Sequence, residues 1–307
     1  MRLFLFAALA AAIALPAGWA LPAAAQQLAD ADADLRVAAP AFAAGTGPRL
    51  VIDGGHHNFH TVDGRFAPFA AVVRNDGFQV SGSTTPLTAE SLRDVQVLVI
   101  ANALDASNDK GRWTLPTPSA LKPEEIAAVK TWVEGGGGLL LIADHMPFAG
   151  AAQDLAQAFG FSFSNGFVQR DAPKRPDIFS KADGTLKADV VTEGIDSLRT
   201  FTGSAFTAPA GARPILVLPK GYVSRETRVA WEFDHDTTIV DVEGQLQGAV
   251  MTVGRGRIAV FGEGAMFSAQ VAGPDRRRMG FNAPDAPNNK PFFLRLVRWL
   301  AGALPAA

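Results

Sequence analysis

KPEEIAAVKTWVEGGGGLLLIADH, residues 122–145, predicts a helix that is followed at once by a buried strand. Pro123 suits the first turn of a helix, where its missing N–H is not needed, and the two acidic residues after it suit the positive N-terminal end. We expect the helix to run to Glu134 and to stop at Gly135, because glycine adopts the left-handed conformation that ends many helices. The apolar run 139–142 shows no polar alternation, which is typical of a strand buried on both faces of a parallel sheet.

The same alternation of strand and helix continues on both sides of this stretch. Further strands are expected at 50–52, 77–80, 95–101, 214–218, 228–233, 247–253 and 257–261, and further helices at 66–73, 151–159 and 291–303. Strands that alternate with helices predict an open, mostly parallel sheet with helices on both faces, and we expect the later strands to extend it. The last helix is expected to bury an apolar side made of Phe292, Phe293, Leu296 and Trp299.

The composition excludes several classes of protein. The 307 residues include 48% hydrophobic residues, enough to bury a core, and no cysteine. Without cysteine there is no disulfide, zinc–thiolate site, iron–sulfur cluster or thiol nucleophile. The formal net charge of −2 lacks the basic field of a typical nucleic-acid-binding protein, so no nucleic-acid partner is expected.

The N-terminus has the layout of a secretory signal. Residues 1–25 combine one arginine, a long apolar run and small residues at the end, so we expect cleavage after Ala25. The alternative is a membrane anchor, but proline and glycine interrupt the apolar run. We expect a flexible leader over residues 26–48 and a single α/β domain over 49–307. The mature protein is then periplasmic or secreted, with no membrane span.

Titratable side chains gather where the first and fourth predicted strands end. Residues 53–60, DGGHHNFH, hold three histidines and a carboxylate, and the fourth strand is followed by Asp144 and His145. Because ligands of open α/β sheets bind beyond the carboxyl ends of the strands, we expect both loops at one ligand-binding edge. Imidazole and carboxylate groups suit zinc, iron or nickel. The candidate metal ligands are Asp53, His56, His57 and His60. Alternatively, these histidines only make hydrogen bonds that order a glycine-rich loop.

Three further residues are candidates for catalysis. Asp144 lies at a sharp turn from strand to helix and can act as a general base, metal ligand or covalent nucleophile, or simply cap the helix. Glu263 follows the predicted strand that ends at 261 and has similar alternatives, and His145 completes the set.

The candidate ligand-binding residues are Gly54, Gly55, Asn58 and Asn102. The basic run 276–278 is either solvated or holds an anionic substrate.

Four segments carry a family resemblance: WVEGGGGLL at 132–140, TEGI at 192–195, GRGRIAVFG at 254–262 and RWLAG at 298–302. In this order they resemble the glutamine-amidotransferase-like superfamily. Within it, the chain looks most like the ThuA-like proteins and the auxiliary domains of gliding-type transporters. The resemblance implies a flavodoxin-like α/β fold over nearly the whole mature chain, with extra C-terminal strands.

The chain departs from that family at the residue on which its best-known reaction depends. True amidotransferases place a catalytic cysteine at the elbow after the glycine-run strand, whereas this chain has Asp144 and His145 there. Glutamine hydrolysis by the cysteine mechanism is therefore excluded. For some ThuA-like relatives the resemblance implies a sugar or sugar-like ligand, so the expected partner is a small molecule such as a carbohydrate.

Two functions from different classes follow. We favour a secreted hydrolase or lyase that acts on a sugar-like or other small polar substrate, with or without a divalent metal such as zinc. Its site would join Asp53, His56, His57, His60, Asp144, His145 and Glu263. The alternative is a non-catalytic ligand-binding or assembly domain of the cell envelope. The preference for an enzyme rests on the three histidines near one strand end, which exceed what packing needs.

Overall fold

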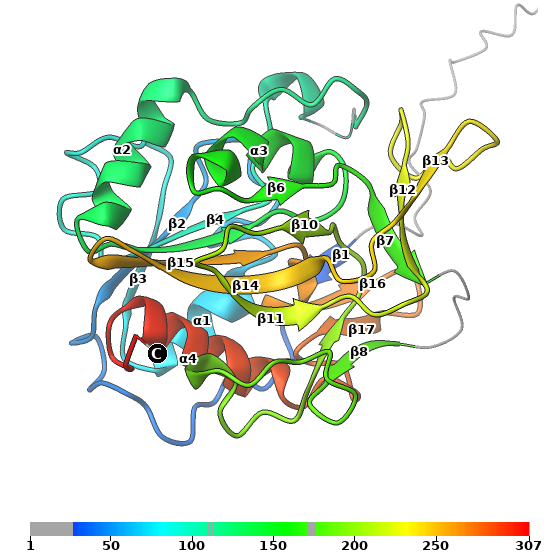
Figure 1. The fold of residues 1–307 in the computed structure, drawn as a ribbon. Helices are drawn as coiled ribbons and strands as arrows, with labels where there is room; N and C mark the ends of the chain where they lie inside the picture. The colour runs from blue at the N-terminus through cyan, green and yellow to red at the C-terminus, as the bar shows by residue number, and fades with distance from the viewer. Residues whose placement is uncertain (1–26, 110, 112, 171–175, 307) are drawn as a thin grey trace, which may run out of the picture.

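A nine-stranded mixed sheet forms the centre of the computed structural model, which describes residues 27–109, 111, 113–170 and 176–306 (Figure 1). Its strands lie in the order β3-β2-β4-β5-β15-β14-β10-β6, and β11 also pairs with β14. The parallel strands are β2 (Arg49–Asp53), β3 (Gln79–Ser83), β4 (Val97–Ala101), β5 (Gly138–Ile142) and β15 (Gly256–Phe261). The antiparallel strands are β6 (Ser162–Phe163), β10 (Phe206–Thr207), β11 (Arg213–Val217) and β14 (Leu246–Val253).

The five parallel strands have a defined topology. Numbered along the chain, they lie in the order 2-1-3-4-5, which is one of the two common orders of doubly wound sheets. The expected α/β fold with a parallel sheet is therefore confirmed for this part of the chain. The signal sequence expected at 1–25 lies outside the described residues.

Helices cover both faces of the sheet, as the buried strands require. They are α1 (Ala67–Asn75), α2 (Pro123–Glu134), α3 (Phe148–Ala158) and α4 (Asn289–Leu300). In Figure 1, α2 and α3 lie on one face and α1 and α4 on the other. Alternate residues of β4 divide accordingly: Val97 and Val99 pack in the core that contains α1 and α4, and Leu98 and Ile100 pack on the opposite side. Among the described residues, no helix has the length and apolarity needed to cross a membrane.

The later strands predicted at 214–218, 247–253 and 257–261 extend the central sheet as expected, as β11, β14 and β15. Several strands that the sequence did not indicate lie outside it. Three small sheets are formed by β1 (Gln27–Ala29) with β16 (Ala269–Ala272) and β17 (Arg277–Gly280), by β7 (Phe167–Arg170) with β12 (Tyr222–Glu226) and β13 (Thr238–Asp241), and by β8 (Asp177–Ser180) with β9 (Ser197–Thr200). Short 3-10 helices are η2 (Ala106–Asn108), η3 (Val190–Thr192) and η4 (Ala265–Phe267). In Figure 1, β12 and β13 form a hairpin that projects from the body; we call residues 222–241 the arm.

The strand expected at 228–233 does not form. Within this segment only Val229 makes an isolated bridge, to Thr114, and Trp231 has a left-handed backbone with φ 68°. An aromatic, half-apolar segment satisfies the sequence pattern of a strand, but here it bends back over the body of the protein. Helix α3 also starts at Phe148, three residues before the predicted start at Ala151.

The described part of the predicted leader is packed against the domain rather than flexible. Strand β1 pairs with β16, and the buried carboxylate of Asp30 accepts a hydrogen bond from Asn282 Nδ2 at 2.8 Å. Asp76 accepts the Ala41 N–H at 2.9 Å and pairs with Arg298 of α4. These partners lie far away in the sequence, so local composition could not indicate them.

Candidate functional site

Parallel pairing brings four of the candidate polar residues to one edge of the sheet. Asp53 ends β2, Asn102 follows β4, and Asp144 and Glu263 each lie two residues beyond the ends of β5 and β15. Strands β2, β4, β5 and β15 are successive neighbours in the sheet, so their carboxyl ends share the edge where ligands of such folds bind.

Asn102 links this edge to a buried histidine. Its Oδ1 accepts the Asp144 N–H at 2.9 Å, which directs its Nδ2 to donate to His60 Nδ1 at 3.0 Å. The backbone of Asn102 is left-handed, with φ 50°, a conformation that asparagine tolerates better than most residues. Burial, and then the positive charge of Arg65, lower the pKa of His60 to about 3. His60 is therefore a neutral histidine that accepts a hydrogen bond inside the core.

His56 bridges two buried carboxylates. Its Nδ1 lies 2.8 Å from Asp53 Oδ2 and its Nε2 lies 3.1 Å from Glu125 Oε1. Burial alone would lower the pKa of His56, but the hydrogen bonds and charges of the two carboxylates outweigh it and raise the pKa. Asp53 also accepts the Gly55 N–H at 3.1 Å and Asn58 Nδ2 at 3.0 Å. This ion triad therefore orders the glycine-rich loop, which is the second of the two alternatives left open by the sequence.

The four candidate metal ligands do not fit a shared centre. The His57 ring contacts Asp109 at 3.0 Å on the surface, where the histidine side chain is 43% exposed. Both nitrogens of His56 have carboxylate partners, and His60 is held by Asn102. Over the described ranges of the chain, no group of three or more histidine, aspartate and glutamate side chains is placed to hold a metal ion.

Gly54 and Gly55 place the loop close to its neighbour. The Gly54 N–H donates to the Ser83 carbonyl at 2.8 Å, and a side chain at Gly55 would lie 3.1 Å from the Thr84 carbonyl oxygen. These two candidate ligand-binding residues thus serve the packing of the loop against the end of β3, whereas Asn58 orders the loop from within by accepting the His56 N–H at 3.0 Å.

Asp144 and Glu263 form a buried carboxyl pair. Glu263 is 1% exposed, and its two oxygens accept backbone N–H groups of η4, each at 2.8 Å. Asp144 accepts the N–H groups of His145 at 2.8 Å and Gly264 at 3.3 Å. Burial, and then the charge of Asp144, raise the pKa of Glu263 well above its usual range. Glu263 is therefore both the cap of η4 and a carboxyl group that favours its protonated form.

His145 presents a free ring nitrogen. Its Nδ1 lies 2.7 Å from the Met146 carbonyl oxygen, which can only accept, so Nδ1 carries the proton and Nε2 a lone pair in the neutral ring. Among the described residues, Nε2 has no hydrogen-bond partner. The ring stacks on Phe167 with centroids 4.4 Å apart, and it makes an edge-to-face contact with Trp231 with centroids 4.7 Å apart. Trp231 is 49% exposed, so the group that covers His145 is itself open to solvent.

Aromatic rings from several segments surround His145. This aromatic cluster consists of Phe59, Trp113, His145, Phe148, Phe167, Trp231 and Phe233. The arm contributes the two rings at 231 and 233 and is tied to the body by the Ala230 N–H, which donates to the Trp113 carbonyl at 2.9 Å. This cluster could not be predicted, because the sequence WEF at 231–233 has the pattern of a strand. The exposed tryptophan beside a histidine becomes visible only when the arm is folded back.

Arg65, at the border of the aromatic cluster, was also missed. Its guanidinium carbon lies 3.6 Å from the centre of the Phe59 ring, and its Nη1 donates to the Phe59 carbonyl at 3.4 Å. Its Nε is buried without a partner, and no carboxylate pairs with it in the described part of the chain. Burial lowers the pKa of this guanidinium. An arginine without a counter-charge favours an anionic or oxygen-rich group nearby.

Comparison with known proteins supports the fold. Neither a family model nor a curated protein sequence matches this chain. The N-terminal domain of mmIFT52 matches with a TM-score of 0.56 at 12% identity, over 82% of this chain and 96% of that one. The cytoplasmic protein STM1381 from Salmonella typhimurium LT2 matches with a TM-score of 0.50 at 14% identity, over 82% and 98%. A protein described as ThuA-like, from Bacteroides uniformis, has a TM-score of 0.47 at 13% identity, over 88% and 94%. The first two likenesses concern the fold alone.

Proposed function

We propose that this protein is an exported, non-catalytic ligand-binding domain of the flavodoxin-like, glutamine-amidotransferase-like type, which holds a small saccharide against His145 and Trp231. Export rests on the signal sequence expected at residues 1–25, and the 2-1-3-4-5 strand order supports the fold type. The observation that carries the proposed function is the free Nε2 of His145 inside the aromatic cluster.

The chemistry of the aromatic cluster suits a sugar. A saccharide has apolar C–H faces that pack on an aromatic ring and hydroxyl groups that donate hydrogen bonds, and the half-exposed Trp231 and the lone pair of His145 Nε2 match these two properties. The imidazole is held by Met146 and Phe167, so little side-chain freedom is lost when a ligand binds. The uncompensated charge of Arg65 favours a sugar that carries a carboxylate.

The other histidines give no support to an enzyme. His56, His57 and His60 each have a partner that explains their position, so the crowding of imidazoles is accounted for by an ordered loop. These partners support the binding domain over the hydrolase or lyase that the sequence favoured.

Isothermal titration calorimetry of the untagged protein with glucose, trehalose and glucuronate tests the proposal. We expect at least one sugar to bind, and Trp231→Ala to weaken that binding more than about tenfold through the loss of a stacking surface. Ile239→Ala is the matched control, because this residue of the same arm is 56% exposed and lies outside the aromatic cluster. Absence of binding by all three sugars, or equal binding by the two variants, would contradict the proposal.

A hydrolase or lyase is a second candidate, favoured by one observation. Glu263 lies beside Asp144 and has a raised pKa. In carboxyl pairs of this kind one member stays protonated and can act as an acid. If this candidate holds, the wild-type protein turns over a member of a glycoside, ester and lactone panel. Asp144→Asn is then expected to lower the rate at least about a hundredfold, within the range for loss of a general base. A wild-type protein that turns over nothing in the panel excludes it.

A further inference from the structure

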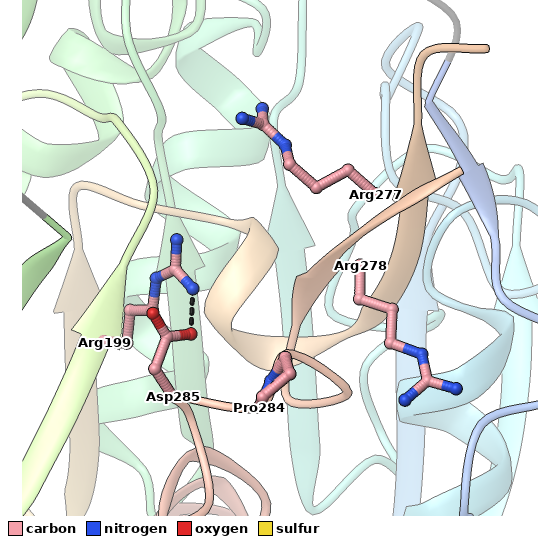
Figure 2. Close-up of a pocket in the computed structure, with 5 residues that line it drawn as sticks. All are labelled: Arg199, Arg277, Arg278, Pro284 and Asp285. Carbon is pink, nitrogen blue, oxygen red and sulfur yellow. Dashed lines mark hydrogen bonds and ion pairs between the residues drawn. The ribbon is translucent and has the colours of Figure 1, made fainter. Parts of the chain in front are cut away.

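A separate pocket of about 510 Å³ lies away from the aromatic cluster. It is lined by Arg199, Arg277, Arg278, Pro284 and Asp285 (Figure 2). These residues come from β9, β17 and the loop before α4, so the pocket shares no residue with the site described above. Its volume falls in the range of small-molecule sites.

The lining carries an excess of positive charge. Three arginines and one carboxylate line the pocket, and that carboxylate, Asp285, is already paired with Arg199. Arg277 and Arg278 are exposed and form no ion pair with any described residue. Two of the three cations therefore have no counter-ion of their own.

Arg199 is fixed in place and incompletely satisfied. Its backbone N–H donates to Asn289 Oδ1 at 3.0 Å, its carbonyl accepts from Asn289 Nδ2 at 2.8 Å, and its guanidinium carbon lies 4.3 Å from the centre of the Phe201 ring. Its Nε is buried and has no hydrogen-bond partner among the described residues. A buried donor of this kind calls for an acceptor.

Arg277 extends toward Arg199, whereas Arg278 turns away. Successive side chains of a strand point to opposite faces, and Figure 2 shows Arg277 directed to the side of Arg199 and Arg278 to the other side. Burial, and then the charge of Arg277, lower the pKa of the Arg199 guanidinium, so the two groups repel each other. An anion between them would remove that repulsion.

We propose that this pocket binds the oxyanion group of a small molecule, phosphate or carboxylate, between Arg199 and Arg277. The planar guanidinium fork matches both groups, because each oxyanion can accept two parallel N–H hydrogen bonds. Asp285 holds one terminal nitrogen of Arg199, and Figure 2 shows the other directed to the side of Arg277, which leaves that nitrogen and the Arg277 fork for the ligand. This proposal is independent of the function proposed for the aromatic cluster.

Calorimetric titration with inorganic phosphate and, separately, with citrate tests this pocket, at a fixed ionic strength set by sodium chloride. We expect saturable binding of at least one probe, weakened about tenfold or more in Arg277→Gln, and less than about twofold in Arg276→Gln. Arg276 is the matched control because it is exposed, adjacent and equally charged but does not line the pocket. Arg199→Lys keeps the charge and removes the planar guanidinium, so it is also expected to weaken binding, with an unchanged circular dichroism spectrum as the check on folding.

Comparing how much each variant weakens anion binding distinguishes a specific binding site from a general attraction by positive charge. Equal weakening in Arg276→Gln and Arg277→Gln would mean that only overall charge attracts the anion, and would overturn the proposal. Absence of saturation with both probes would overturn it as well. Binding of one probe alone, with the expected order of variants, identifies which oxyanion the pocket accepts.

Discussion

Replacing His56 by alanine is expected to lower the free energy of unfolding by about 3–5 kcal/mol, because it leaves two buried carboxylates without their shared cation. Asp53 and Glu125 lie 2.8 and 3.1 Å from the ring nitrogens of His56 and are nearly inaccessible. His57→Ala is the matched control: this neighbour is 43% exposed and contacts only Asp109 among the pairs described, so its loss is expected to cost less than about 1 kcal/mol. Urea unfolding of the two variants measures both values. Equal losses of unfolding free energy in the two variants would contradict a stabilising role of the ion triad.

The stabilisation from His56 is also expected to depend on pH. Because its two carboxylate partners raise the folded-state pKa against the effect of burial, the stabilisation is fully present below the unfolded value of about 6.5. It is lost as the pH rises through the higher folded-state pKa. The difference in unfolding free energy between the wild type and His56→Ala should therefore shrink when measured at increasing pH above about 6.5. A difference that stays constant or grows over that range would contradict the assignment of a charged His56.

His145→Phe is expected to reduce saccharide binding by about tenfold to a hundredfold, because it removes the Nε2 acceptor and leaves the ligand hydroxyl unpaired. The phenyl ring keeps the stacking on Phe167, which lies 4.4 Å away in the wild type, so the fold is expected to be retained. The cost in unfolding free energy should be about 1 kcal/mol, for the lost hydrogen bond to the Met146 carbonyl.

Two controls make the His145 result specific. His235→Ala removes a histidine of the arm that is 89% exposed and outside the aromatic cluster, and it should leave binding unchanged. Isothermal titration with the sugar that binds the wild type gives the dissociation constants, and urea unfolding gives the stabilities. If His145→Phe binds as the wild type does, the imidazole nitrogen is not a ligand contact.

The parts of the fold that local chemistry determines could be predicted from the sequence. The helix at 123–134 has the predicted limits, since Pro123 sets its start and the glycine run its end. The residue with a positive φ is Gly136, at 125°, and not Gly135 as predicted, whose φ is −77°. The strand predicted at 228–233 was wrong because the same aromatic residues that favour a strand also favour packing on a distant ring such as Phe167. Sequence patterns give the apolar character of such a segment, but not the surface on which it is buried.

For the candidate site, the sequence predicted the position of the residues at the sheet edge better than the role of each side chain. The apolar runs in the sequence show where the strands end. They therefore predicted the edge of the sheet at which Asp53, Asn102, Asp144 and Glu263 lie. His56, His57 and His60 each have a partner 42 to 69 residues away, which is Glu125 for His56 and Asn102 for His60. The spacing within DGGHHNFH carries no information about these partners, so the sequence is compatible both with a metal cluster and with an ordered loop.

The central claim, that His145 Nε2 receives a ligand, is tested most directly by long-range ¹H–¹⁵N NMR of the imidazoles during titration with the sugar panel. We predict that the Nε2 signal of His145 moves on binding while those of His56 and His60 stay in place. An Nε2 signal of His145 that no sugar in the panel shifts would contradict the account.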